Sequence, residues 1–144
     1  MTYKELIDRQ QKEYNAFPIG ACFNQKQFQE MMAKWGMTVN DTKKILSLGG
    51  GSYIRLTDAK AYNEMLLRFT KEKDEAIAAD KTGDGFIYEM FLYELANHEY
   101  CITYDIDEVL DAVGLRAENI AKDKRLQHGL KKAQKEYLKN SEDY

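Results

Sequence analysis

The stretch Phe86–His98 constrains the fold of this chain most strongly, because apolar residues occupy most of its positions. Its apolar residues are Phe86, Ile87, Met90, Phe91, Leu92, Tyr93 and Leu95. As a helix, this stretch is apolar nearly all round, and such a helix belongs inside a core. We therefore expect a helical domain organised around this segment.

Amphipathic helical patterns lie on both sides of this segment. Capping-box spacing at Thr2 and Glu5, and again at Asn24 and Gln27, predicts where two of these helices begin. A further capping residue, Asp123, precedes the last helix. The expected helices run from Tyr3 to Pro18, from Asn24 to Gly36, over 59–79, over 106–113, over 117–122 and from Asp123 to Lys139.

Short apolar runs predict a small amount of β-structure. The runs 46–48 and 52–56 flank Gly49–Gly51, and this pattern indicates a hairpin because glycine allows tight turns. Residues 19–23 form a further candidate strand, and the β-prone run 100–104 could pair with the hairpin. The predicted fold class is α+β, mainly α, with about five to seven helices around a central apolar helix and a small antiparallel hairpin or sheet.

A length of 144 residues fits a single domain, which we place at residues 1–139, followed by a frayed tail at 140–144. The first residues lack the apolar core of a signal peptide, and no apolar run is long enough to span a membrane. Cys22 and Cys101 are far apart in the sequence, and we expect reduced thiols rather than a disulfide. A cytoplasmic location is the prediction.

Charge is unevenly distributed along the chain. Residues 72–111 contain 12 acidic and 2 basic residues, whereas residues 1–71 and 112–144 have net charges of +4 and +3. One interpretation is that solvated helix faces of opposite charge pair with each other. The other is that an acidic surface binds a basic partner.

The loop after residue 79 partly matches a calcium-binding EF-hand. Asp80, Thr82 and Asp84 occupy ligand positions 1, 3 and 5, but position 12, which requires a bidentate glutamate, is Phe91. We therefore predict a polar turn between helices and no cofactor, with calcium binding as the alternative.

Glu94 and His98 are four residues apart, so a helix would bring them to one face. We expect a helix-terminal histidine that contacts Glu94 and the last carbonyl groups. A partner contact and a metal or proton-transfer role are the alternatives. The only other histidine is His128, and no nucleophile or zinc signature is present, so we predict no enzymatic activity.

Two features of the sequence are typical of DNA-binding proteins. Gly114 stands between two short helices, an arrangement similar to a helix-turn-helix, and Lys131, Lys135 and Lys139 recur at helical spacing. The would-be recognition helix 117–122 contains one acidic and one basic residue, which makes it a weak reader of a DNA groove. A DNA-binding accessory protein is therefore an alternative function.

Several motifs resemble a small family of unknown function carried by phages, plasmids and conjugative elements of gut bacteria. The similar segments are 49–55 with 58–59, 86–88 with Phe91, 93–100, Leu110 with 114–115, and Leu126 with Ala133. The resemblance extends over residues 1–138 and is most specific at 93–100. It implies a setting in which small acidic proteins inhibit host defences, as anti-CRISPR proteins do.

Charge and this resemblance together lead to one hypothesis: a non-enzymatic inhibitor that binds a host nuclease, such as a Cas9-like enzyme, or another defence protein through an acidic surface. The expected partner-binding residues are Glu94, Asn97, His98, Glu99, Tyr100, Asp105, Asp107, Glu108 and Asp111.

Overall fold

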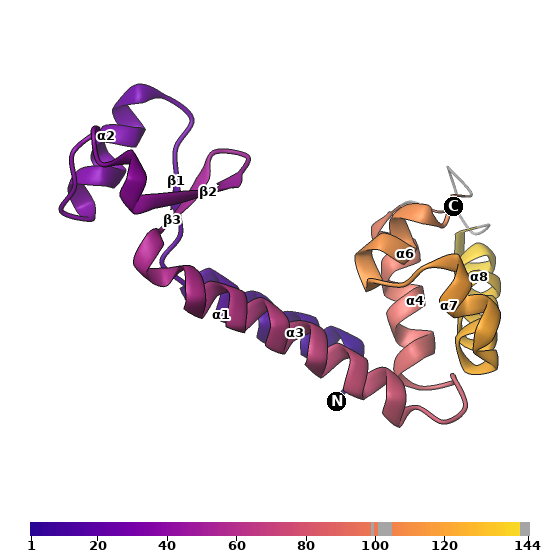
Figure 1. The fold of residues 1–144 in the computed structure, drawn as a ribbon. Coiled ribbons are helices and arrows are strands. Elements are labelled where there is room, and N and C mark those ends of the chain that lie inside the picture. Colours follow the sequence, from indigo (N-terminus) through magenta and orange to yellow (C-terminus); the bar gives the residue numbers. More distant parts are fainter. Residues whose placement is uncertain (99, 101–104, 142–144) are drawn as a thin grey trace. The chain divides into compact units, whose positions relative to one another are not determined.

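The computed structural model describes residues 1–98, 100 and 105–141, and it confirms a mainly helical α+β fold (Figure 1). The helices are α1 (Tyr3–Ala16), α2 (Gln25–Lys34), α3 (Ala59–Ala79), α4 (Phe86–Asn97), α6 (Asp107–Val113), α7 (Ala117–Lys122) and α8 (Lys124–Ser141). The strands are β1 (Gly20–Ala21), β2 (Ile45–Gly49) and β3 (Ser52–Arg55). The predicted capping box at the first helix is present, because the Thr2 and Glu5 side chains each accept the other residue's backbone N–H.

The chain divides into two compact units. The first, which we call the α4 unit, consists of Met1–Arg9 and Glu72–Tyr144, and the second, the hairpin unit, consists of Gln10–Lys71. Helices α1 and α3 each contribute one end to each unit. Compactness alone does not decide domain number, so the single domain over residues 1–139 stays a prediction.

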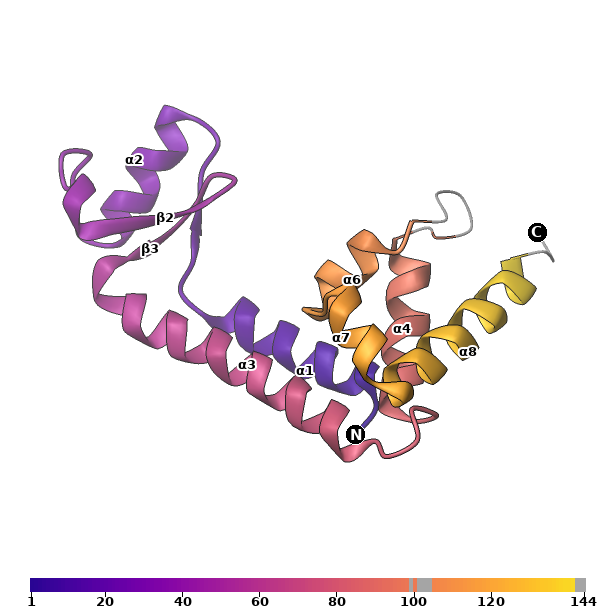
Figure 2. The same cartoon turned by 45° about the vertical axis from the view of Figure 1, so that its right-hand side comes forward.

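Helix α4 is the centre of the α4 unit. Its apolar residues Ile87, Met90, Phe91 and Leu95 are fully buried, as predicted. Helices α6 and α8 pack against it, and both views show them beside α4 (Figures 1 and 2). The buried core comprises Tyr3, Leu6, Ile77, Phe86, Ile87, Met90, Phe91, Leu95, Tyr100, Val109, Leu110, Val113, Leu126, Leu130 and Ala133.

The corner between α6 and α7 is a packed turn. Gly114 ends α6 in the left-handed conformation, at φ 70°, and the N–H of Leu115 donates to the carbonyl of Leu110 at 2.9 Å. The Lys73 ammonium lies against this helix end, 2.9 Å from where a Cβ on Gly114 would be. A cation at this position stabilises the negative end of the helix dipole.

The hairpin unit contains the predicted hairpin. Gly49–Gly51 all have positive φ and connect β2 to β3. Within residues 19–23 only Gly20–Ala21 form a strand, β1, which adds to β3 and gives the antiparallel sheet order β1-β3-β2. Helix α2 supplies Met31 and Met32 to a small core that also contains Cys22, a free thiol.

Two predictions fall partly on residues outside the described ranges. Residues 101–104 of the expected strand, including Cys101, lie there, and Tyr100 has helical backbone geometry, so no strand begins at that residue. Residues 142–144 of the expected frayed tail also lie there, whereas α8 continues to Ser141. Across the described ranges, no helix has both the length and the apolar character needed to cross a membrane.

Candidate functional site

Three polar side chains in the α4 unit, those of Tyr3, Glu94 and His98, contact one another in a row, which we call the polar chain. Tyr3 and Glu94 are 2% and 5% exposed, and the Tyr3 hydroxyl donates to Glu94 Oε1 at 2.7 Å. The other carboxylate oxygen, Oε2, lies 3.3 Å from His98 Nε2. This last contact is poorly aligned for a hydrogen bond, so we describe it as an electrostatic pair. The helical spacing of Glu94 and His98 therefore brings them together, as predicted.

His98 also connects this chain to α6. Its Nδ1 atom lies 3.4 Å from Oε2 of Glu108, whose side chain is 74% exposed. The backbone N–H of His98 donates to the Glu94 carbonyl and ends α4. One histidine thus bridges a buried carboxylate and a surface carboxylate. The sequence did not predict the Glu108 contact, because it depends on how α6 packs against α4.

The surroundings of Glu94 shift the pKa values of two neighbours. Burial raises the pKa of the Tyr3 phenol well above its usual range, and the hydrogen bond and charge of Glu94 add to this. Burial lowers the pKa of Lys73, while the charges of Asp74 and Glu94 oppose that change. Tyr3 therefore remains a protonated donor to Glu94 at neutral pH.

The carboxylates of Glu94 and Glu108 approach different nitrogens of the His98 ring, so the three side chains do not converge on one point. Within the described part of the chain, no three His, Cys, Asp or Glu side chains are arranged to hold a metal ion. A metal or proton-transfer role at this site would therefore depend on His98 and the two carboxylates beside it, Glu94 and Glu108.

Exposed carboxylates gather at α6. Asp105, Asp107, Glu108 and Asp111 are all exposed, and we call these four residues the acidic face. The Asp105 carboxylate accepts the N–H of Asp107 at 2.9 Å and so helps to start the helix. No lysine or arginine occurs in the sequence between Lys81 and Arg116. The buried side of α6 consists of Val109, Leu110 and Val113.

The remaining predicted partner-binding residues differ in accessibility. Asn97 is exposed, and Glu99 lies outside the described residues. Tyr100 is buried, and its hydroxyl accepts a hydrogen bond from Gln134 at 3.2 Å. Glu94 and Tyr100 are buried, so they offer a partner little surface in this structure, and their role in partner binding stays a prediction.

In the loop after α3, Asp80 organises a turn. Its carboxylate accepts backbone N–H groups from Thr82, Gly83, Gly85 and Ile87, at 2.9 to 3.2 Å. Partial burial opposes ionisation of Asp80, but these four hydrogen bonds outweigh it and lower its pKa. Both oxygens of the first potential calcium ligand are thus engaged by the backbone.

The other EF-hand positions also serve the fold. Asp84 pairs with His128 Nε2 at 2.7 Å and with Lys132 Nζ at 3.1 Å, and both partners belong to α8. These pairs lower the pKa of Asp84, with the His128 contact as the largest cause. Phe91, at the position of the missing glutamate, is fully buried. The Asp84 pairs are also an instance of the acidic middle pairing with the basic C-terminal region.

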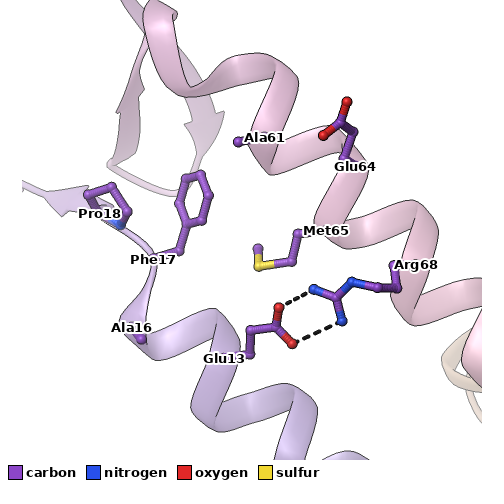
Figure 3. Close-up of a pocket in the computed structure, with 8 residues that line it drawn as sticks. All are labelled: Glu13, Ala16, Phe17, Pro18, Ala61, Glu64, Met65 and Arg68. Carbon is purple, nitrogen blue, oxygen red and sulfur yellow. Dashed lines mark hydrogen bonds and ion pairs between the residues drawn. The ribbon is translucent and has the colours of Figure 1, made fainter.

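The hairpin unit has a hollow that no sequence motif predicted (Figure 3). It has a volume of about 490 Å³ between the end of α1 and the start of α3. Phe17 and Met65 face its interior, and the carboxylate of Glu13 pairs with the guanidinium of Arg68 at its rim (Figure 3). The walls are largely apolar, and the charged groups of Glu13 and Arg68 are paired with each other, so we assign no catalytic role to the hollow.

Comparison with known proteins places the chain in a family but gives it no activity. No curated protein and no solved structure matches it. A family of unknown function, DUF7659, matches residues 2–136, which include the Tyr3–Glu94–His98 chain and the acidic face. The protein therefore belongs to DUF7659, a family of unknown function.

Proposed function

We propose that this protein is a non-enzymatic inhibitor that binds a host-defence nuclease, such as a Cas9-like enzyme, through the acidic face. The observation that supports the proposal is the exposure of Asp107, Glu108 and Asp111 on α6, a short helix whose opposite side is buried, and of Asp105 just before it. Val109 and Val113, both fully buried, anchor the helix that carries Asp107, Glu108 and Asp111. A preorganised charged surface loses little entropy when it binds.

The choice of partner follows from charge. Nucleases bind the phosphate backbone with lysine and arginine side chains, and closely spaced carboxylates can occupy the same basic surface. The setting in host defence comes from the resemblance to proteins of phages and other mobile elements. The mechanism is then competition with nucleic acid for a basic channel.

The direct test is a DNA-cleavage assay with a purified Cas9-like nuclease loaded with guide RNA. We expect the wild-type protein to inhibit cleavage, and the double variant Asp107→Lys/Asp111→Lys to inhibit at least about tenfold more weakly. Both positions are exposed, so the variant should fold normally. Added target DNA should relieve inhibition by the wild-type protein.

A matched control separates a specific surface from bulk charge. The variant Glu30→Lys/Glu64→Lys alters two exposed carboxylates of the hairpin unit and changes the net charge by the same amount. It should inhibit as well as the wild-type protein. An absence of inhibition by the wild-type protein, or equal losses in both variants, would rule out the proposal.

A second candidate is DNA binding by α8. Lys131, Lys135 and Lys139 are exposed and lie at helical spacing, which suits contact with a phosphate backbone. Gel shifts with random duplex DNA at low salt would test it. A shift that the triple Lys→Ala variant abolishes would support this candidate, and no shift would exclude it.

A further inference from the structure

We infer that the hairpin unit has a groove for a short extended peptide, lying between the outer edge of β1 and helix α2. This inference is independent of the proposed function, because it concerns other residues and another unit. The ligand class is a peptide segment that adds to the sheet edge and carries an apolar residue and a carboxylate on its inner side.

The backbone of β1 has groups that can pair with an added strand. β1 is an edge strand, since the sheet order is β1-β3-β2. The N–H of Cys22 donates to the Gly51 carbonyl at 2.9 Å, and Gly20 pairs with Tyr53. Because hydrogen-bonding direction alternates along an antiparallel strand, the N–H and C=O of the residue between them, Ala21, point away from β3. Ala21 is exposed.

A hollow of about 580 Å³ lies along this edge, and α2 forms its other wall. Met31, which is 7% exposed, and Trp35 provide apolar surface. Glu30, Lys34 and Arg55 provide charged groups around it. The arrangement of a strand edge beside a helix is the one by which several domain types bind extended peptides.

The charges around the groove favour a peptide with a carboxylate. Arg55 is held by Asp58 at 2.8 Å, and Glu30 contributes one negative charge. Lys34 is exposed and has no ion pair within residues 1–98, 100 and 105–141, so it is the cation that can receive the carboxylate of a ligand. The hairpin unit as a whole carries 9 basic and 5 acidic residues, a net charge of +4. An acidic peptide is therefore attracted to the unit and finds Lys34 at the groove.

The shortness of β1 limits the length of the ligand. The strand has two residues and follows Pro18, and both features discourage long edge-to-edge pairing. Few backbone hydrogen bonds can form, so specificity must come from side chains that contact Trp35 and Lys34. A segment of about five residues fits this requirement.

Trp35 makes the inference simple to test, because it is the only tryptophan in the chain. The probe is the peptide acetyl-Thr-Leu-Thr-Glu-Thr-amide, and the control peptide has lysine in place of glutamate. Titration should change the fluorescence of Trp35, and the acidic peptide should bind at least about fivefold more tightly than the control. Hydrogen exchange at the Ala21 amide should slow on binding, while exchange at Gly20, which faces β3, should not change.

Two variants on the same helix provide the matched comparison. Lys34→Glu should reverse the preference between the two peptides. Lys26→Glu changes an exposed lysine of α2 that does not line the groove, and it should leave the preference unchanged. No fluorescence change with either peptide up to about 5 mM, or identical behaviour of the two variants, would overturn the inference.

Discussion

The α4 unit and the hairpin unit differ in charge and in what stabilises them. The α4 unit carries 19 acidic and 12 basic residues, a net charge of −7, whereas the hairpin unit has a net charge of +4. The α4 unit has a large core in which α4 is buried along most of its length. The hairpin unit has a small core around Cys22, Met31 and Met32, and its sheet depends on a turn of three glycines.

The two units therefore expose different kinds of binding group. In the α4 unit, a large buried core anchors α6, whose outer side carries exposed carboxylates. In the hairpin unit, little apolar surface is buried, and backbone groups of β1 remain at an edge. We therefore expect binding by side-chain charge in the first unit and by backbone pairing in the second. The four predictions below test the physical basis of this contrast.

The largest expected effect is on the core of the α4 unit. Phe91→Ala should lower the free energy of unfolding by about 3–5 kcal/mol, because it removes a fully buried ring. Urea denaturation followed by circular dichroism measures this. Leu67→Ala, at a position 70% exposed, is the control and should cost less than about 0.5 kcal/mol. Equal costs would mean that α4 does not anchor the unit.

The next effect concerns the buried polar chain. Tyr3→Phe should cost about 1–3 kcal/mol, because it leaves the buried Glu94 carboxylate without its hydroxyl donor. The double variant Tyr3→Phe/Glu94→Met removes both partners and should be less destabilised than the sum of the two single variants. Strict additivity of the two substitutions in thermal unfolding would contradict a direct interaction.

A smaller effect is expected at the glycine turn of the hairpin unit. Gly50→Ala should cost about 1 kcal/mol, since its φ is 60° and no atom beyond its two neighbours in the chain lies within 4 Å of the added methyl group. Gly51→Ala should cost more, about 2 kcal/mol, because its Cβ would lie 2.6 Å from the Cys22 carbonyl oxygen. Hydrogen exchange of the β2 and β3 amides would show which of the two variants is less stable. A larger loss of stability for Gly50→Ala than for Gly51→Ala would argue against this turn geometry.

The smallest effect depends on pH. The folded state lowers the pKa of Asp80, so its contribution to stability is complete above the ordinary carboxylate pKa and is lost as pH falls through the lowered value. Asp80→Asn should therefore cost about 1 kcal/mol at pH 7 and progressively less below about pH 4. Urea midpoints at several pH values measure this, and a cost that does not change with pH would refute the assignment.

Local patterns predicted much of the fold. The apolar stretch that became α4, the capping box at Thr2 and the Gly49–Gly51 turn each depend on interactions within a few residues, which sequence spacing reveals. The same holds for Glu94 and His98, which are one helical turn apart.

Contacts between distant parts of the chain could not be predicted in this way. Tyr3 donates to Glu94 across 91 positions in the sequence, and His98 meets Glu108 only because α6 packs on α4. Burial of Glu94 and Tyr100 also depends on that packing, so the sequence alone did not reveal it. The groove beside β1 depends on which strand lies at the sheet edge, and no local motif encodes this.

The most direct test of the central claim is the salt dependence of affinity between this protein and a purified Cas9-like nuclease. If the acidic face provides the binding energy, the dissociation constant of the wild-type protein should rise at least about tenfold between about 50 and 300 mM NaCl. The Asp107→Lys/Asp111→Lys variant should bind weakly at both salt concentrations. Tight wild-type binding that does not change with salt, or a variant that binds as well as the wild-type protein, would contradict the account.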